Sequence, residues 1–288
     1  KDLLGILLTH AHEDHIGAIA HLWPLLECPI YATPFTASLI KEKLREKRVQ
    51  VGDNLKIIQL NGNVNLGPFN IDYVSLTHSI LEPNALSIKT PAGTLFHTGD
   101  WKCDSEPLIG EKMDEGKLKD IGDKGVLAMI CDSTNIFSEG RSGSEKDVRD
   151  SMMTIMENIK NRIVVTTFAS NASRMETVFK CAEKVGRHLS LVGRSMHRIY
   201  NTARDCGYLQ DIKPPLDPRD AKKIPRNNSQ AWGYAISSFV PNIFAHYSIY
   251  HKLYDYDPTT HQNIINMGES FFAQWDYYPA IVKENEWA

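Results

Sequence analysis

The sequence has no apolar run long enough to cross a bilayer. The run from Leu3 to Leu8 spans six residues, whereas a membrane helix needs about 20. It also lacks an excess of basic residues, because its formal net charge is −3, so no general attraction for nucleic acid is expected. With 42% hydrophobic and 23% charged residues, the composition is that of a globular protein with no membrane partner.

Paired cysteines are absent as well. The chain has five scattered cysteines, an odd number, and no C-x-x-C pair, which argues against a disulfide framework and a structural zinc finger. A reducing cytoplasm is therefore the expected compartment. The first residue is Lys1, and an apolar run follows almost at once, so we expect the chain to begin inside a domain. It offers no basis for judging a targeting signal.

The region from Asp2 to Asp132 reads as sheet-rich α/β. Short apolar runs are broken by Gly, Pro and Asn, with a few amphipathic stretches between them. We expect strands at 3–8, 30–32, 55–60, 71–76, 85–89, 94–97 and 126–131, and helices at 17–26 and 34–47. The segment from Gly110 to Gly125, with its alternating charges, is expected to be a surface loop or a frayed helix.

The pattern changes after a turn at residues 138–144. Helices are expected at 145–160, 173–185 and 196–206, with strands at 163–167 and 189–192 between them. This alternation predicts a small parallel sheet with crossover helices. Residues 229–288 then hold 14 of the 26 aromatic residues. We therefore expect a first domain at 1–139, a second at 140–228 and an aromatic-rich tail at 229–288.

The stretch Thr9-His10-Ala11-His12-Glu13-Asp14-His15 directly follows the first predicted strand. In an extended segment His10 and His12 point to the same side, while Asp14 and His15 occupy the turn into a helix. Each pair can hold one ion. Imidazole and carboxylate ligands without cysteine favour a catalytic zinc site, with manganese or another divalent ion as the alternative. The other interpretation is a helix capped by Asp14, with solvated histidines before it.

Two further candidate ligands stand at strand ends. His78 follows the strand predicted at 71–76, and Asp100 follows the strand predicted at 94–97. Alone, each is an ordinary turn residue. Together with the first motif, they become candidate metal ligands.

The order H-x-H-x-D-H, a lone His and then T-G-D resembles the metallo-β-lactamase superfamily over about residues 1–135. The resemblance implies an αββα sandwich, here without its first strands, and two divalent ions that hold a hydroxide for hydrolysis. The residues implied are His10, His12 and His78 at one ion, Asp14 and His15 at the other, and Asp100 between them.

Further motifs narrow the resemblance to the ribonuclease J branch of the β-CASP nucleases. They are T-H-S-I at 77–80, T-G-D-W-K-C-D at 98–104, C-D-S-T-N at 131–135, T-F-A-S-N at 167–171 and V-G-R-S-M at 192–196. The resemblance implies a partial β-CASP α/β domain and a metal-dependent ribonuclease, 5′-exo, endo or both, in rRNA processing or mRNA decay. Asp132 of the D-S-T-N element would lie beside the metals, a position suited to proton transfer. Asp14 and Asp132 are thus the catalytic candidates.

A basic segment lies inside this second domain. Between Asn158 and Cys206, nine Lys or Arg residues stand against three acids, a net charge of +6. Ordinary solvated helix faces have the same composition, but the resemblance implies that this domain clamps single-stranded RNA. The candidate phosphate contacts are the cations Arg174, Arg194 and Arg198 and, at strand-to-helix turns, Ser170, Asn171 and Ser195.

The sequence departs from the family pattern after Asn228. It has no C-T-G-S-Q-type element, no H-x-S-G-H element and no histidine in a context that matches the last ligand of the second ion. Without the strands that close the sandwich, we expect exposed apolar surface and a weaker second ion. Two alternatives to a ribonuclease stay open: a non-catalytic remnant that binds RNA or a partner, and a hydrolase of a small ester or thioester. Assembly into a homo-oligomer also stays open.

Overall fold

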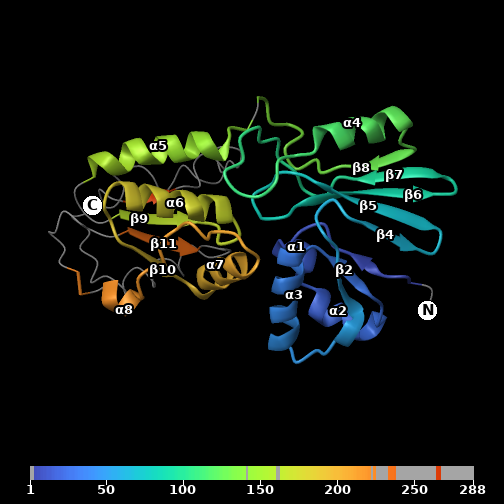
Figure 1. The fold of residues 1–288 in the computed structure, drawn as a ribbon, viewed down its shortest axis with the longest axis horizontal. Coiled ribbons are helices and arrows are strands. Elements are labelled where there is room, and N and C mark those ends of the chain that lie inside the picture. Colours follow the sequence, from blue (N-terminus) through green and yellow to red (C-terminus); the bar gives the residue numbers. More distant parts are fainter. Residues whose placement is uncertain are drawn as a thin grey trace. The chain divides into compact units, whose positions relative to one another are not determined.

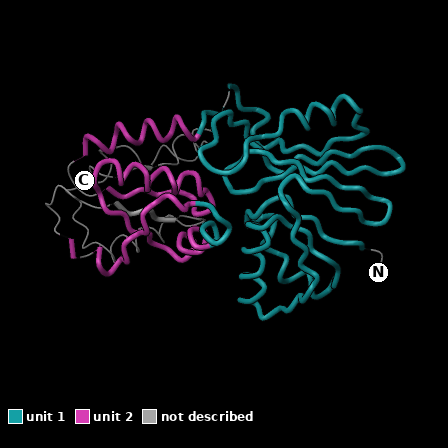
Figure 2. The backbone as a smooth tube through the Cα atoms, in the orientation of Figure 1, with its two compact units in different colours: residues 1–144, 202–208 teal, residues 145–201, 209–288 magenta. Residues whose placement is uncertain are grey.

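The computed structural model describes residues 3–140, 142–159, 163–221 and 223–224, together with the backbone of 233–237 and 264–266. These residues form two compact units, shown in Figure 2. The first comprises residues 1–144 and 202–208, and the second residues 145–201 and 209–288. The domain limits expected from the sequence stay predictions. The limit near residue 228 and the tail histidines at 246, 251 and 261 lie outside the described residues.

The first unit contains a small parallel sheet made of β1 (Ile6–Leu7), β2 (Ile30–Ala32) and β3 (Leu55–Ile57). Ile30 and Ala32, on one face of the central strand β2, are fully buried, and Tyr31 on the other face is half-buried. The helices α1 (Glu13–Ile16) and α2 (Ile19–Leu26) lie between β1 and β2 in the chain. The helix α3 (Pro34–Glu46) and a 3₁₀ turn (Gly52–Asn54) lie between β2 and β3. Helix α3 packs on β2 and β3 with its apolar side (Figure 1).

A second sheet in the same unit has five strands in sequence order. They are β4 (Asn63–Leu66), β5 (Phe69–Ser75), β6 (Asn84–Thr90), β7 (Gly93–His97) and β8 (Ala128–Ile130). Neighbours are antiparallel from β4 to β7, and β8 runs parallel to β7. The sequence predicted every strand except β4, in which two Asn side chains alternate with Val64 and Leu66.

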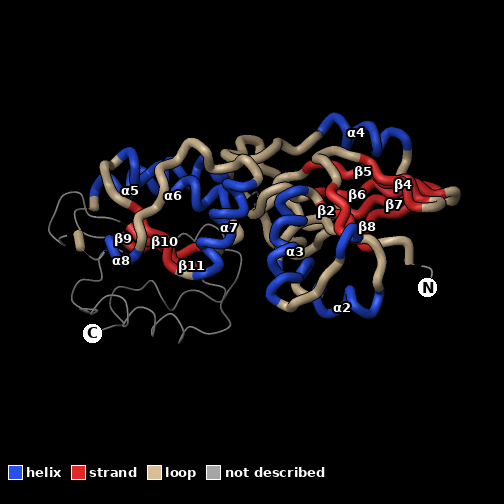
Figure 3. The backbone as a smooth tube through the Cα atoms, turned by 60° about the horizontal axis from the view of Figure 1, so that its bottom comes forward, coloured by secondary structure: helices blue, strands red, loops and turns tan. Residues whose placement is uncertain are grey.

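The alternation of side chains along β5 gives this sheet two apolar faces. On one face Ile71 and Tyr73 pack with Leu7 of the small sheet. On the other, Val74 and Phe96 pack against the helix α4 (Glu115–Lys124). The layers are therefore helix, sheet, sheet, helix (Figure 3), and the αββα sandwich expected from the sequence is confirmed.

Helix α4 corrects the expectation of a loop or frayed helix at 110–125. The Asp114 carboxylate caps its first turn by accepting a hydrogen bond from the Lys117 amide at 2.9 Å. Leu118 and Ile121 then pack on the sheet. The alternating charges of this segment thus form the solvent side of an amphipathic helix.

The sandwich leaves apolar side chains exposed beside β8, which is an edge strand. Leu127, Met129 and Ile130 are 70%, 63% and 51% exposed. This is the exposed apolar surface that the sequence led us to expect. Within the described ranges, no helix combines the length and apolar character needed to span a membrane.

The second unit is built on a parallel sheet with the strand order β10-β11-β9-β12. The strands are β9 (Ile163–Thr167), β10 (Leu189–Val192), β11 (Gly233–Ser237) and β12 (Ile264–Asn266). The helices are α5 (Glu145–Asn158), α6 (Ala172–Lys184), α7 (Arg194–Asp205), whose last residues belong to the first unit, and the short α8 (Pro218–Ala221). The predicted small parallel sheet is confirmed, and the backbone of the tail contributes two of its strands.

A buried ion pair joins α5 to α6 in this unit. The Arg174 guanidinium donates to Glu145 through Nε at 2.9 Å and through Nη2 at 3.1 Å. The two side chains are 3% and 9% exposed. Asn171 caps α6 by accepting from the Arg174 amide at 2.9 Å. These contacts fix the turn between β9 and α6.

Replacing Arg174 with Met should destabilise the protein by about 3–5 kcal/mol, because Glu145 would be left buried without its partner. Urea unfolding measures this change. The matched control is Lys146→Ala on the same helix, whose partner Asp150 is exposed, so its effect should stay below about 0.5 kcal/mol. An Arg174→Met cost no larger than that of the control would contradict the structural role of the pair.

Candidate metal centre

The strand directions bring the candidate ligands to one edge of the sandwich. β6 is antiparallel to both β5 and β7, and β8 is parallel to β7, so β5, β7 and β8 all end at the same edge. The amide of Asn84, at the start of β6, donates to the carbonyl of Thr9 at 3.0 Å and so holds the segment after β1 at this edge. His78, Asp100 and Asp132, which follow β5, β7 and β8, therefore lie near the histidines that follow β1.

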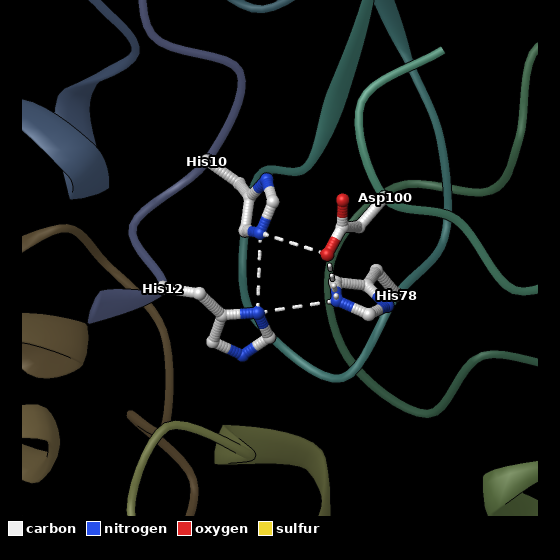
Figure 4. Close-up of side chains that lie close together, drawn as sticks. All are labelled: His10, His12, His78 and Asp100. Carbon is white, nitrogen blue, oxygen red and sulfur yellow. Dashed lines mark hydrogen bonds and ion pairs between the residues drawn. The ribbon is translucent and has the colours of Figure 1, made fainter. Parts of the chain in front are cut away.

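The first ligand group consists of His10, His12, His78 and Asp100 (Figure 4). The Nδ1 atom of His12 lies 3.1 Å from Nε2 of His10 and 3.1 Å from Nε2 of His78. The Asp100 Oδ2 atom lies 3.9 Å from each of the same two Nε2 atoms. All four donor atoms lie within 4.8 Å of one another.

These separations fit a tetrahedral ion. With zinc–ligand bonds of about 2.0–2.1 Å, the ligand atoms of a tetrahedral site stand about 3.3–3.4 Å apart. Four of the six pairs of ligand atoms stand 3.1–3.9 Å apart, around that value, and all the pairs lie within 4.8 Å. Three imidazole nitrogens and a carboxylate oxygen are also the donor set that zinc and similar divalent ions accept.

The second ligand group consists of Asp14, His15 and Asp100. Nε2 of His15 lies 3.5 Å from Asp14 Oδ2 and 3.4 Å from Asp100 Oδ1. The Asp100 carboxylate thus faces the first group with one oxygen and the second with the other. In the described part of the chain, this group has three members, and the Asp14 side chain is 77% exposed.

Burial keeps the histidines of the first group neutral. It lowers the pKa of His10 far below its usual range, with a further lowering from neighbouring histidines. Burial is also the largest cause of the lowered pKa of His12, which falls to about 4, and of the lowered pKa of His78, which falls to about 3. Burial raises the pKa of the Asp100 carboxyl, and His15 opposes that shift. The imidazole lone pairs are therefore available to a cation at neutral pH.

Polar contacts behind the ligands fix their orientation. The Thr9 hydroxyl lies 3.1 Å from Nδ1 of His10, which leaves Nε2 to face the group. Gly99 adopts a φ of +58°, and a Cβ there would lie 2.8 Å from the Asn84 carbonyl oxygen and 3.1 Å from the Thr9 side chain. The turn that presents Asp100 therefore requires glycine.

Asp132 lies at the same edge of the sandwich, beside the first group. Its amide donates to the Thr98 hydroxyl at 3.0 Å, and its carboxylate accepts from the amide and hydroxyl of Thr134 at 2.9 and 2.6 Å. Burial alone would raise the pKa of this carboxyl, but the Thr134 hydrogen bonds and the nearby His78 outweigh it, so the pKa is lowered. Asp132 is therefore ionised at neutral pH.

Comparisons with known proteins agree with this geometry. Residues 1–118 match the family described as "Beta-lactamase superfamily domain", and residues 160–230 match "Ribonuclease J, beta-CASP domain". The chain belongs to the β-CASP branch of the metallo-β-lactamase superfamily.

Among curated β-CASP relatives, Ribonuclease J of Sinorhizobium meliloti is 43% identical over 227 residues, which cover 79% of this chain and 40% of that protein. Ribonuclease J of Corynebacterium glutamicum is 41% identical over 72% of this chain and 29% of its own length. The chain thus spans well under half of these relatives. A crystal structure of a protein of unknown function from Enterococcus faecalis matches with a TM-score of 0.57 and 17% identity, over 91% of this chain and 68% of that one, and supports the fold alone.

The candidate RNA contacts of the β-CASP unit differ in exposure. The structure argues against phosphate contacts by Arg174 and Asn171, because both side chains are buried and donate to the Glu145 carboxylate. Arg194 is exposed at the start of α7, and Ser195, Arg198 and Ser170 are half-buried. These four stay predictions.

Asn84 belongs to the centre but was missed in the sequence. Its side-chain amide donates to the carbonyls of Thr9 and Glu82, at 3.2 and 2.7 Å, and it is 1% exposed. The available signal was a polar residue at the first position of β6, directly before the apolar pair Ala85 and Leu86. Its partner Thr9 lies 75 residues away in the chain, so no local motif identifies this contact.

The stability of the metal-stripped protein should depend on pH through these histidines. The pKa values of His12 and His78 are near 4 and 3 in the folded state but about 6.5 in the unfolded chain. Between these values only the unfolded state binds protons, so the free energy of unfolding should fall as the pH drops from about 6.5 to 4. Each histidine contributes at most about 1.4 kcal/mol per pH unit.

Urea unfolding at several pH values tests this dependence. His78→Gln should reduce the slope because one titrating group is removed, whereas substitution of the exposed His188 should leave it almost unchanged. A metal-stripped protein with the same stability at pH 7 and pH 5 would refute the assigned pKa shifts.

Gly99→Ala should cost about 1–3 kcal/mol of stability and weaken metal binding, because the strained turn and the close contacts move Asp100. Unfolding curves and metal titrations measure the two effects. Gly122→Ala in α4 is the control, because a Cβ there meets nothing within 4 Å and a helix gains from alanine. Equal behaviour of the two variants would contradict the requirement for glycine at position 99.

Proposed function

We propose that this protein is a metal-dependent ribonuclease that hydrolyses phosphodiesters of single-stranded RNA, from the 5′ end, internally or both, in RNA processing or decay. The observation that carries this proposal is the pair of ligand groups that share Asp100, in a chain whose next segment matches the ribonuclease J β-CASP family. The five cysteines are free thiols, which supports a reducing cytoplasm as the site of action.

Two divalent ions are the proposed cofactors, with zinc as the first choice and manganese as the alternative. His10, His12, His78 and Asp100 would hold one ion, and Asp14, His15 and Asp100 the other. The donor set of imidazoles and carboxylates supports this choice. Such ions supply Lewis acidity and lower the pKa of water.

The chain's own residues have separate proposed roles. The neutral imidazoles of the first group provide lone pairs, and the Asp100 carboxylate contributes one oxygen to each group. Asp14 is exposed enough to meet solvent and substrate. Asp132 is ionised and fixed by Thr134, so it can take a proton from the attacking water and return it to the leaving RNA oxygen.

The second unit supports RNA as the substrate. Its sequence between Asn158 and Cys206 carries a net charge of +6, and Arg194 is exposed at the start of α7. Cations of this kind contact phosphates without reading sequence. The curated relatives are named Ribonuclease J, which favours RNA over a small ester or thioester.

A non-catalytic RNA-binding protein is the second candidate. The observation that favours it is the second ligand group, which has three members among the described residues and includes the largely exposed Asp14. A weakly held second ion would reduce or abolish hydrolysis while RNA binding remains.

Cleavage of a labelled 5′-monophosphorylated RNA in zinc or manganese tests the proposal. Asp132→Asn should lower the rate by about 100- to 10,000-fold, because a proton-transfer group is lost. Asp14→Ala should abolish metal-dependent cleavage. Asp53→Ala, an exposed carboxylate in the 3₁₀ turn before β3, is the control and should cleave like the unaltered chain.

Three outcomes separate the candidates. Cleavage that disappears with a chelator and with Asp14→Ala supports the ribonuclease, and cleavage of a circular RNA identifies internal cutting. RNA binding without cleavage supports the second candidate. Hydrolysis of p-nitrophenyl acetate without any RNA cleavage would assign the protein to small esters instead.

A further inference from the structure

Trp101 directly follows the candidate ligand Asp100 in the chain, and its side chain is partly exposed. The side chain is 39% exposed, although burial of the large apolar surface of a tryptophan usually stabilises the folded state. Its sequence neighbours Asp100, Lys102 and Asp104 are charged. Trp101 therefore places an exposed aromatic side chain between the charged residues Asp100 and Lys102 of the chain.

The backbone on both sides of Trp101 is fixed. The Trp101 backbone helps to lower the pKa of the Asp132 carboxyl. The next amide, of Lys102, donates to the Thr77 carbonyl at 2.7 Å, and the Asp104 amide donates to the Thr77 hydroxyl at 3.2 Å. The Thr77 hydroxyl in turn donates to the Lys102 carbonyl. The indole thus stands on a loop tied to the elements that present His78 and Asp132.

We propose that Trp101 is a stacking platform for one base of single-stranded RNA, next to the phosphodiester that lies at the metal centre. The proposal takes its substrate class from the proposed function. Exposed aromatic rings on rigid backbones bind unpaired bases by stacking, and a nearby cation adds attraction for the phosphates. Lys102, the next residue along the chain, supplies that cation.

The surroundings favour a nucleotide over a protein partner. A protein interface needs a contiguous apolar patch, such as the exposed side chains at the edge strand β8. A base needs only one flat ring with charge beside it. Trp101 matches the second description, because charged residues flank it along the chain.

Binding of a fluorescent, nuclease-resistant phosphorothioate RNA strand to the full metal-loaded chain tests the proposal without relying on cleavage. Trp101→Ala should weaken binding about tenfold, whereas Trp101→Phe, which keeps a flat ring, should stay within about twofold. Phe69→Ala is the matched control. Phe69 is also 39% exposed. It is the first residue of β5, about 20 Å from the end of that strand that leads to His78. Its loss should therefore leave RNA binding unchanged.

Strands with single abasic positions show whether stacking is the cause. At the position that meets Trp101, removal of the base should weaken binding to the unaltered chain, with no further loss on Trp101→Ala. The proposal would be overturned if Trp101→Ala bound RNA as tightly as the unaltered chain, or if the unaltered chain bound no RNA. It would also be overturned if Trp101→Ala weakened binding of a fully abasic strand as much as binding of the intact strand. A chain that binds in this way but never cleaves RNA would refute the ribonuclease proposal and leave the stacking site standing.

Discussion

The whole centre depends on the position of one carboxylate. Asp100 faces His10 and His78 with one oxygen and His15 with the other, so a shift of its turn disturbs both ligand groups. That turn requires glycine at position 99, because the residue there has a positive φ and a side chain would collide with Thr9 and Asn84. The preceding Thr98 hydroxyl also holds the amide of Asp132. One tight turn after β7 therefore sets the geometry of the ligands and of the adjacent acid.

This arrangement has a cost in the absence of metal. Burial keeps three closely spaced imidazoles neutral, and their nitrogens face one another instead of water. A bound cation satisfies these lone pairs, so metal binding should stabilise the folded state as well as serve chemistry. The two groups differ in this respect, because the second contains the exposed Asp14. The first ion should thus be held more firmly than the second.

Much of the fold and the grouping of the candidate metal ligands were predictable because their signals are local. The strand periods gave seven of the first unit's eight strands, and the spacing of His10, His12, Asp14 and His15 around a strand end placed them together. What failed depends on distant partners. The cationic Arg174 looks like a phosphate contact in sequence, but Glu145 buries it. Helix α4 is revealed only by its packing on the sheet, and Asn84 by its bond to Thr9.

Metal content measured by mass spectrometry on the purified, zinc-loaded chain tests the central claim most directly. The account predicts two ions per chain, one ion after His15→Ala, and loss of the firmly held ion after His78→Ala. A chain that holds no zinc, or one that keeps two ions after both His15→Ala and His78→Ala, would contradict a dinuclear centre built around Asp100.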